Sequence, residues 1–191
     1  MGSPPTDDDA ALLALTAAGD GAAYAALVER HQGRVYRFLV RLLPPAAAED
    51  ALQETFLRVL QKAGSFRGEG SVLSWLLGIA KNEARMLSRK SVAIDRTAVS
   101  LETLGAEAGW GQESPEDLAS LVDRREALER GLSQLDPSER EVLLMRAVLS
   151  LSGEETAAAL GISVASMKSR LHRARLRLLA VLKKGGFDGR E

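Results

Sequence analysis

The chain has 191 residues and no cysteine, which excludes disulfide bonds, thiol catalysis and cysteine-based zinc sites. Its length allows one medium domain or two small ones, and 46% hydrophobic residues with 4% aromatics predict helix-favouring cores of Leu, Val and Ala. The formal net charge is -1, yet residues 24–90 and 127–191 are basic while residues 1–23 and 91–126 are acidic. Two basic blocks around an acidic one suggest two modules that face a polyanion and a connector that does not.

The amino-terminal segment is acidic and lacks the basic start and long apolar run of a signal peptide. No apolar run in the chain approaches the roughly 20 residues that a membrane helix needs. We therefore expect a soluble, cytoplasmic protein without membrane insertion.

The first basic block predicts helices. Asp20 is placed to cap a helix whose apolar residues recur at helical spacing across residues 24–42. Pro44 and Pro45 end this helix, because proline cannot continue it. Residues 1–21 precede the block as an acidic arm.

Two further helices are expected in the same block. One covers residues 46–62 and is followed by a polar loop with several glycines at residues 64–71. Ser71 then caps a helix that ends near Arg89, with Trp75 expected in its core-facing stripe. Residues 22–91 are therefore predicted to form one helical domain.

The periodicity fades in the acidic block, which is rich in Gly and Ser. A connector of this length is unusual inside a compact domain. Residues 92–124 are therefore predicted to be a flexible acidic linker between two domains. Trp110 is unexpected there, since disordered linkers seldom carry Trp.

The last block, residues 125–184, is predicted to be a second helical domain, followed by a tail at residues 185–191. Asp136 combines with Pro137 and Glu139 in the pattern of a helix start: a capping residue, a proline at the first helical position and a Glu three residues after the cap. Ser152 and Glu155 repeat the capping-box spacing.

The segment 151–174 predicts a helix-turn-helix. A capped helix is followed by a turn at Gly161 and a second helix capped by Ser163, with Ala157 where the two helices cross. On a helical wheel the apolar stripe of the second helix consists of Val164, Met167, Leu171, Ala174 and Leu178, and the opposite side carries Ser166, Ser169, Arg170, Arg173 and Arg177.

A helix that is apolar on one side and cationic on the other suits a recognition helix, because Arg and Ser reach base edges and phosphates in the major groove. Lys168 and Arg175 flank the apolar stripe and are better placed for phosphates or neighbouring helices. The alternatives are a solvated surface helix or a helix that lies on a membrane surface. The preceding helix and turn favour groove recognition.

The helix at residues 49–63 carries a second pattern. Its predicted inward face consists of Leu52, Phe56, Val59 and Leu60, and its outward face of Asp50, Gln53, Glu54, Leu57 and Gln61. An exposed leucine among polar groups is typical of a protein–protein contact. The alternative is a solvated face with one exposed leucine.

A third pattern covers residues 65–90. A loop with Phe66 and Arg67 precedes a helix whose second half carries Lys81, Asn82, Arg85, Arg89 and Lys90. Aromatic and amide groups beside positive charge suit single-stranded or unstacked bases. Phe66 and Trp75 can also be core residues, and for Trp75 a core position is favoured.

No catalytic set is recognisable. The two histidines, His31 and His172, lie in different blocks without metal-ligand spacing. Neither a phosphate-binding loop nor a nucleophile elbow occurs. We therefore expect no enzyme activity, no metal and no cofactor.

These three segments, in this order, resemble the sigma factors of bacterial RNA polymerase, specifically the small extracytoplasmic function (ECF) class. Residues 49–63 resemble region 2.2, residues 66–90 regions 2.3 and 2.4, and residues 135–178 region 4. The resemblance implies an all-α protein of two small helical domains, the second with a helix-turn-helix. It also implies a factor that binds core RNA polymerase, directs it to promoters and helps to melt them.

The resemblance further implies roles for single residues. Those that would bind the polymerase are Asp50, Gln53, Glu54 and Leu57. Those that would handle the minus-ten element as melted strand are Phe66, Arg67, Lys81, Asn82 and Arg85. Those that would read the minus-thirty-five element as duplex are Ser166, Lys168, Ser169, Arg170 and Arg173. The acidic linker would follow the polymerase towards its active-site cleft and RNA exit channel, and an anti-sigma protein is an expected partner.

The chain departs from the family pattern in the first helix of the turn, where Ser152-Gly153 and Thr156 replace an aromatic residue and Ile. Gly153 weakens a helix start, and Thr156 brings a hydroxyl near the core. Met167 stands where Val is usual.

Two other classes of function are compatible with parts of the sequence. A helix-turn-helix repressor or activator would bind duplex DNA tightly without polymerase. A pure interaction protein that sequesters partners would be indifferent to neutralising Arg170 and Arg173.

Overall fold

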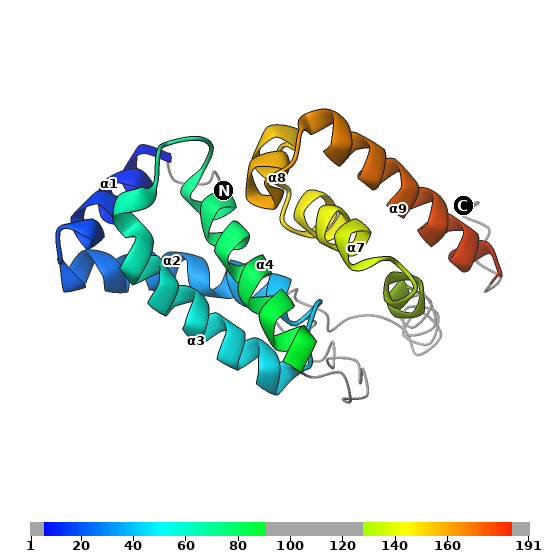
Figure 1. Cartoon of the computed structure of the whole chain (residues 1–191), viewed down its shortest axis with the longest axis horizontal. Coiled ribbons are helices and arrows are strands. Elements are labelled where there is room, and N and C mark those ends of the chain that lie inside the picture. The colour runs from blue at the N-terminus through cyan, green and yellow to red at the C-terminus, as the bar shows by residue number, and fades with distance from the viewer. Residues whose placement is uncertain (1–5, 91–127, 185–191) are drawn as a thin grey trace, which may run out of the picture.

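The computed structural model describes residues 6–90 and 128–184, and its described part is built of helices in two groups (Figure 1). The predicted all-α fold class is confirmed. The predicted linker at residues 92–124, with Trp110, and the predicted tail at residues 185–191 lie outside the described residues. The exact domain boundaries therefore stay predictions.

The first group is an antiparallel bundle. Its elements are α1 (Thr6–Ala17), α2 (Gly21–Leu39), α3 (Pro45–Lys62), the 3₁₀ turn η1 (Ala63–Ser65) and α4 (Val72–Lys90). The predicted caps are present: the Asp20 carboxylate accepts hydrogen bonds from the amides of Ala22 and Ala23 at 2.8 and 3.0 Å. The hydroxyl of Ser71 accepts one from the amide of Ser74 at 3.2 Å. Local hydrogen bonding thus explains where α2 and α4 begin.

Long apolar side chains from α2, α3 and α4 fill the core of this bundle, among them Phe38, Val59 and Leu76. Trp75 is partly buried against the core, as favoured, and its ring meets that of Phe66 edge to face at a centroid distance of 5.8 Å. The prediction for Leu60 was wrong, because its side chain is 46% exposed rather than inward.

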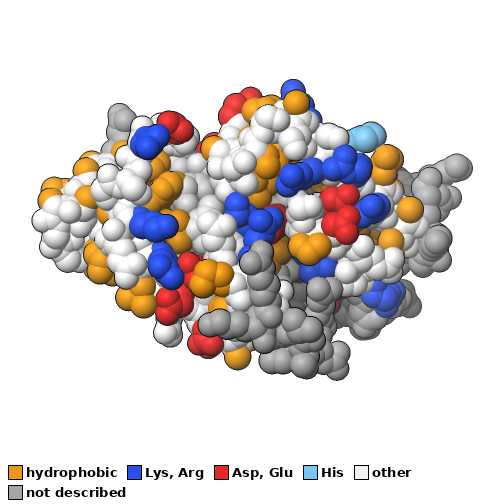
Figure 2. All heavy atoms as spheres, viewed as in Figure 1, with side chains coloured by type: hydrophobic (Ala, Val, Ile, Leu, Met, Phe, Trp, Pro, Cys, Tyr) orange, Lys and Arg blue, Asp and Glu red, His pale blue; other side chains and the backbone are white. Residues whose placement is uncertain are grey.

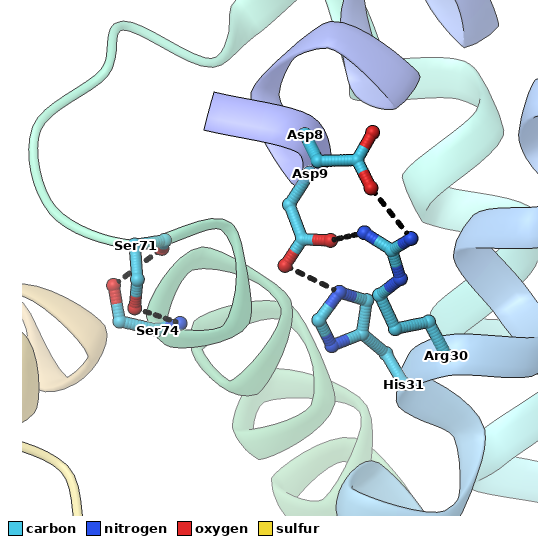
Figure 3. A network of polar contacts seen from close by, with 6 residues as sticks. All are labelled: Asp8, Asp9, Arg30, His31, Ser71 and Ser74. Atoms are coloured by element: carbon cyan, nitrogen blue, oxygen red, sulfur yellow. Dashed lines mark hydrogen bonds and ion pairs between the residues drawn. The ribbon is translucent and has the colours of Figure 1, made fainter. Parts of the chain in front are cut away.

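The acidic arm contains α1, which packs on α2. Leu13 is only 1% exposed. Figure 3 shows the polar part of this contact: Arg30 of α2 donates to the carboxylates of Asp8 and Asp9 at 2.7 and 2.6 Å, and Nε2 of His31 lies 3.0 Å from Asp9. Ion pairs between the acidic arm and Arg30 thus help to hold α1 against α2.

The second group begins with a helical segment at residues 128–133. It continues with α7 (Pro137–Leu143), the π-helical turn η2 (Leu144–Val148), α8 (Gly153–Leu160) and α9 (Val164–Lys184). Ser152 and Glu155 form both bonds of the predicted capping box, and Gly161 ends α8 in the left-handed region with φ 67°. The hydroxyl of Ser163 accepts from the amide of Ser166 at 3.1 Å, as expected for the start of α9.

The start of α7 differs in one respect from the prediction. The helix begins at Pro137 after Asp136, as expected, but the Asp136 side chain caps no amide of α7. Its carboxylate instead accepts a hydrogen bond from Arg177 of α9. The guanidinium of Arg177, rather than an amide of α7, therefore donates to the Asp136 carboxylate. The local sequence pattern does not indicate this contact, because Arg177 belongs to another helix.

The two groups touch through α4 and α8, which lie side by side (Figure 1). The backbones approach closely at Gly78, where an added Cβ would meet the carbonyl oxygen of Ala159 at 3.1 Å. Glycine therefore favours this close crossing, because a larger residue would require the neighbouring backbone to shift.

Candidate nucleic-acid and polymerase interfaces

The predicted helix-turn-helix is formed by α8 and α9. Ala157 is 3% exposed where the two helices meet, and Met167 is 2% exposed beneath them. The predicted apolar stripe of α9 faces inward: Leu171 and Ala174 are buried, and Val164 and Leu178 are partly buried against the core. The polar side of α9 is consequently turned away from the core.

The departures from the family pattern compensate for one another. A Cβ on Gly153 would meet the terminal methyl of Met167 at 3.1 Å, so the small residue leaves room for the longer side chain. Thr156 is fully buried, and its hydroxyl donates to the carbonyl of Ser152 at 2.8 Å. The buried hydroxyl therefore has its partner, and the turn keeps a packed core.

Four of the predicted duplex-reading residues, Ser166, Ser169, Arg170 and Arg173, lie opposite the apolar stripe of α9, and Lys168 flanks that stripe. Lys168, Ser169 and Arg173 are exposed, while Ser166 and Arg170 are half-buried. Arg173 donates to the hydroxyl of Ser169 at 3.0 Å. In Figure 2, Lys and Arg side chains gather over the second group and near the junction with the first, with acidic side chains between them.

Arg177 is exposed on the predicted outward side of α9, but it already has acidic partners. It donates to Glu139 at 2.9 Å and to Asp136, so it is directed at α7. Glu139 is 2% exposed, and the Nε of Arg173 lies 3.5 Å from it. The second half of α9 therefore uses part of its positive charge to hold α7, and Arg177 fastens α9 to the rest of its domain.

The five predicted minus-ten residues are not equally accessible. Arg67 and Asn82 are exposed, and Phe66 is half-buried against Trp75. Lys81 is only 7% exposed, and its Nζ donates to the carbonyl oxygens of Ala159 and Leu160 at 3.2 Å each. Burial lowers the pKa of Lys81, with Glu141 opposing that effect.

Arg85 is exposed, with 45% of its side chain accessible, but it also has a partner in the second group of helices. Its Nε and Nη2 donate to the two carboxylate oxygens of Glu141 at 2.9 and 2.7 Å. Both Lys81 and Arg85 thus contact the second domain, which no pattern in the sequence indicated.

A cavity of about 460 Å³ lies between the loop that follows η1 and the turn of the helix-turn-helix. One wall carries Phe66, Arg67 and Trp75, and the other Ala158 and Ile162. The segments assigned to the two promoter elements therefore face one another across this space.

The outward face of α3 is accessible. Asp50, Gln53 and Glu54 are exposed, and the side chain of Leu57 is 50% exposed. Leu60, one helical turn further, is 46% exposed and shares this face, because residues three apart on a helix are neighbours. The exposed apolar patch is thus larger than the sequence analysis predicted, and the three-residue spacing of Leu57 and Leu60 is the signal that could have revealed it.

Within the described ranges, no three His, Asp or Glu side chains converge as metal ligands would. In the same ranges, no helix is long and apolar enough to cross a bilayer.

Comparison with known proteins adds independent findings. The Sigma-70 region 2 family profile matches residues 27–93, and the Sigma-70 region 4 profile matches residues 125–178. The ECF RNA polymerase sigma-E factor of Salmonella typhimurium is 30% identical over 172 residues, covering 87% of this chain and 90% of that protein.

Two solved structures resemble the fold. CnrH in complex with the cytosolic domain of CnrY has a TM-score of 0.69 at 26% identity, covering 93% of this chain and 98% of that one. The sigma factor RpoE in complex with the anti-sigma factor NepR from Bartonella quintana has a TM-score of 0.65 at 24% identity, covering 84% and 96%.

Proposed function

This chain belongs to the sigma-70 family, in its extracytoplasmic function class, and we propose that its two domains divide promoter recognition between melted and duplex DNA. As a sigma factor it directs RNA polymerase to promoters. The finer assignment is supported above all by one observation: a complete helix-turn-helix whose α9 carries Lys168, Ser169 and Arg173 at exposed positions. These residues, with Ser166 and Arg170, would read the minus-thirty-five element.

The first domain would bind the polymerase and handle the minus-ten element. Asp50, Gln53, Glu54 and Leu57 present acceptors around an apolar centre, which is the composition of a protein interface. Phe66, Arg67, Lys81, Asn82 and Arg85 combine an aromatic ring, an amide and cations, which suits an unstacked strand.

The protein would perform no covalent chemistry, because the polymerase makes the phosphodiester bonds. It would act in the cytoplasm, where the polymerase and the chromosome are. An anti-sigma protein is a further expected partner, supported by the fold shared with a sigma factor solved in complex with one.

The deciding experiment is run-off transcription with purified core polymerase on promoter fragments from the chain's own genome. We expect transcripts from a subset of fragments only when this protein is added. If no fragment gives a transcript and the protein does not bind core polymerase, the proposal is wrong.

A further inference from the structure

The carboxylate of Glu139 is buried where α7 packs on α9. Its side chain is only 3% exposed, and glutamate is seldom buried so deeply unless its charge is paired. Oε2 accepts a hydrogen bond from Nη1 of Arg177 at 2.9 Å, and Oε1 lies 3.5 Å from Nε of Arg173. Each oxygen of one buried carboxylate therefore faces a different arginine of α9.

The two arginines differ in what the pairing does. Arg177 also donates to Asp136, so it joins α9 to the start of α7 through two carboxylates. Arg173 meets Glu139 through Nε, while 54% of its side chain is exposed. The Nε end of the Arg173 guanidinium is thus fixed by a buried group, and more than half of the side chain stays open to solvent.

The donors of Arg173 are divided between the protein and the outside. A guanidinium carries one N–H at Nε and an NH₂ group at each Nη, all in one plane. Nε faces Glu139, and Nη1 donates one hydrogen to the hydroxyl of Ser169 at 3.0 Å. The second hydrogen of Nη1 and both hydrogens of Nη2 have no acceptor among the described residues. Two adjacent Nη groups match O6 and N7 of guanine, the commonest specific contact of arginine in the major groove.

This division gives Glu139 a physical influence on DNA reading. Two contacts at different atoms of one planar group fix the orientation of its plane, and a side chain ordered in advance loses less entropy on binding. Glu139 keeps its hydrogen bond with Arg177, so DNA can engage the Nη groups of Arg173 without leaving a buried carboxylate unpaired.

We propose that Glu139 is a positioning residue for base readout, which holds the guanidinium of Arg173 in the plane where its Nη donors contact a guanine of the minus-thirty-five element. Glu139 itself does not touch DNA in this arrangement. The inference rests on the proposed function for the role of Arg173, whereas the hold on Arg173 is measurable in the protein alone.

The mobility of Arg173 tests the hold without DNA or polymerase. NMR relaxation of the Nε–H signals of the full chain reports how ordered each arginine is, and Arg173→Lys identifies the signal of Arg173 by its loss. In the unaltered protein, we expect Arg173 to be clearly more ordered than Arg175, which is also exposed on α9. Equal mobility of these two arginines would refute the proposal, and this comparison requires no variant to fold.

Variants then show which acid holds Arg173. Glu139→Gln removes the charge, Glu139→Met removes both oxygens, and either should make Arg173 as mobile as Arg175. The matched control is Asp136→Asn, which loses the same charge beside Arg177 and keeps a residue suited to a helix start. Arg173 should stay ordered in this control. An Arg173 that stays ordered in a folded Glu139 variant would contradict the proposal.

Promoter discrimination tests the consequence. Holoenzyme is titrated with a promoter found by run-off transcription and with the same fragment after its minus-thirty-five element has been scrambled. Glu139→Gln should weaken binding to the matched promoter about threefold to tenfold relative to the scrambled one, because Arg173 must then be ordered during binding. Asp136→Asn should keep the ratio of the two affinities. Equal losses on both fragments would indicate a purely structural role and refute positioning.

A double variant shows whether Glu139 acts through Arg173. When Arg173 is replaced by alanine, adding Glu139→Gln should cause no further loss of discrimination, because the residue that Glu139 positions is gone. A further loss would contradict the proposal. If the unaltered holoenzyme does not distinguish the two fragments, the proposed function fails and the role in readout fails with it, while the mobility of Arg173 still decides whether Glu139 holds it.

Discussion

His31 lies beneath α1 with 2% of its surface exposed, and its Nε2 faces the carboxylate of Asp9 at 3.0 Å. Burial lowers the pKa of His31 below its usual value of about 6.5, and the nearby Asp9 opposes the shift without reversing it. The folded protein therefore prefers the neutral imidazole. The stability that depends on a neutral His31 is fully present above about pH 6.5. It is lost as the pH falls through the lowered pKa of the folded state, because the unfolded chain then binds a proton at His31 more readily than the folded protein does.

We predict that the free energy of unfolding of the unaltered protein decreases more steeply below about pH 6.5 than that of His31→Gln, by up to about 1.4 kcal/mol per pH unit. Denaturant unfolding at several pH values measures this difference. His172→Gln is the matched control, because His172 is exposed on α9 and the chain has 2 His. Parallel pH curves for the unaltered protein and His31→Gln would show that His31 does not titrate as inferred.

Arg173 is exposed on α9 and steadied by its bond to Ser169. If it contacts base edges, Arg173→Ala should weaken holoenzyme binding to a matched promoter by about 1–3 kcal/mol and relax sequence preference. Arg175→Ala, at an exposed position beside the apolar stripe, should weaken matched and scrambled promoters equally. Fluorescence anisotropy with both duplexes separates the two effects, and equal losses for Arg173→Ala would remove it from base readout.

At the scale of elements, α8 is a short helix that depends on its ends. Its 8 residues contain a glycine at the first position, and a helix of this length is marginal without capping. Ser152 and Glu155 satisfy its first amides with hydrogen bonds of 3.0 and 2.8 Å. The capping box therefore supports both the helix-turn-helix and the end of α8 that meets Lys81.

Ser152→Ala should accordingly lower the free energy of unfolding by about 1 kcal/mol, measured by chemical denaturation. Ser88→Ala is the control, since Ser88 is exposed within α4 and alanine is the better helix former there. No loss in Ser152→Ala would mean that packing alone maintains α8.

The outward face of α3 is the second element with a testable role. Leu57 and Leu60 form an exposed apolar pair beside Gln53 and Glu54. Replacing Leu57 with Asp should weaken binding to core polymerase by about 2 kcal/mol or more, because it places a charge in the centre of the proposed interface. The control is Leu15→Asp, an equally exposed leucine (49%) on α1. Equal binding of both variants to immobilised core polymerase would exclude α3 as the contact.

At the scale of the whole molecule, the net charge and the packing of the two domains both reduce the attraction of the protein alone for DNA. The net charge of -1 provides little general attraction to DNA, and Lys81 and Arg85 of the first domain already have partners in the second. The protein should therefore depend on the polymerase to hold it on a promoter.

We predict that the isolated protein binds promoter duplex no more tightly than non-specific DNA, and that adding core polymerase increases its affinity for the promoter by about a thousandfold or more. Gel-shift titrations at one fixed salt concentration measure both values. Tight, specific binding by the protein alone would favour a conventional helix-turn-helix regulator.

Much of the local structure was predictable from the sequence by itself. The starts of α2, α4, α8 and α9 depend on hydrogen bonds between residues two or three positions apart, which spacing reveals. The inward stripe of α9 follows from helical periodicity in the same way, and so does the exposure of Leu57.

Only the tertiary structure decided which charges stay available. Arg85 and Glu141 are separated by 56 positions, Lys81 and Ala159 by 78, and Arg177 and Asp136 by 41. Pairs so far apart produce no repeating pattern in the sequence, because their contacts depend on how completed helices pack rather than on local spacing. The sequence thus determined where the cations stand along each helix, and the packing of α4 on α8 determined which of them already have partners.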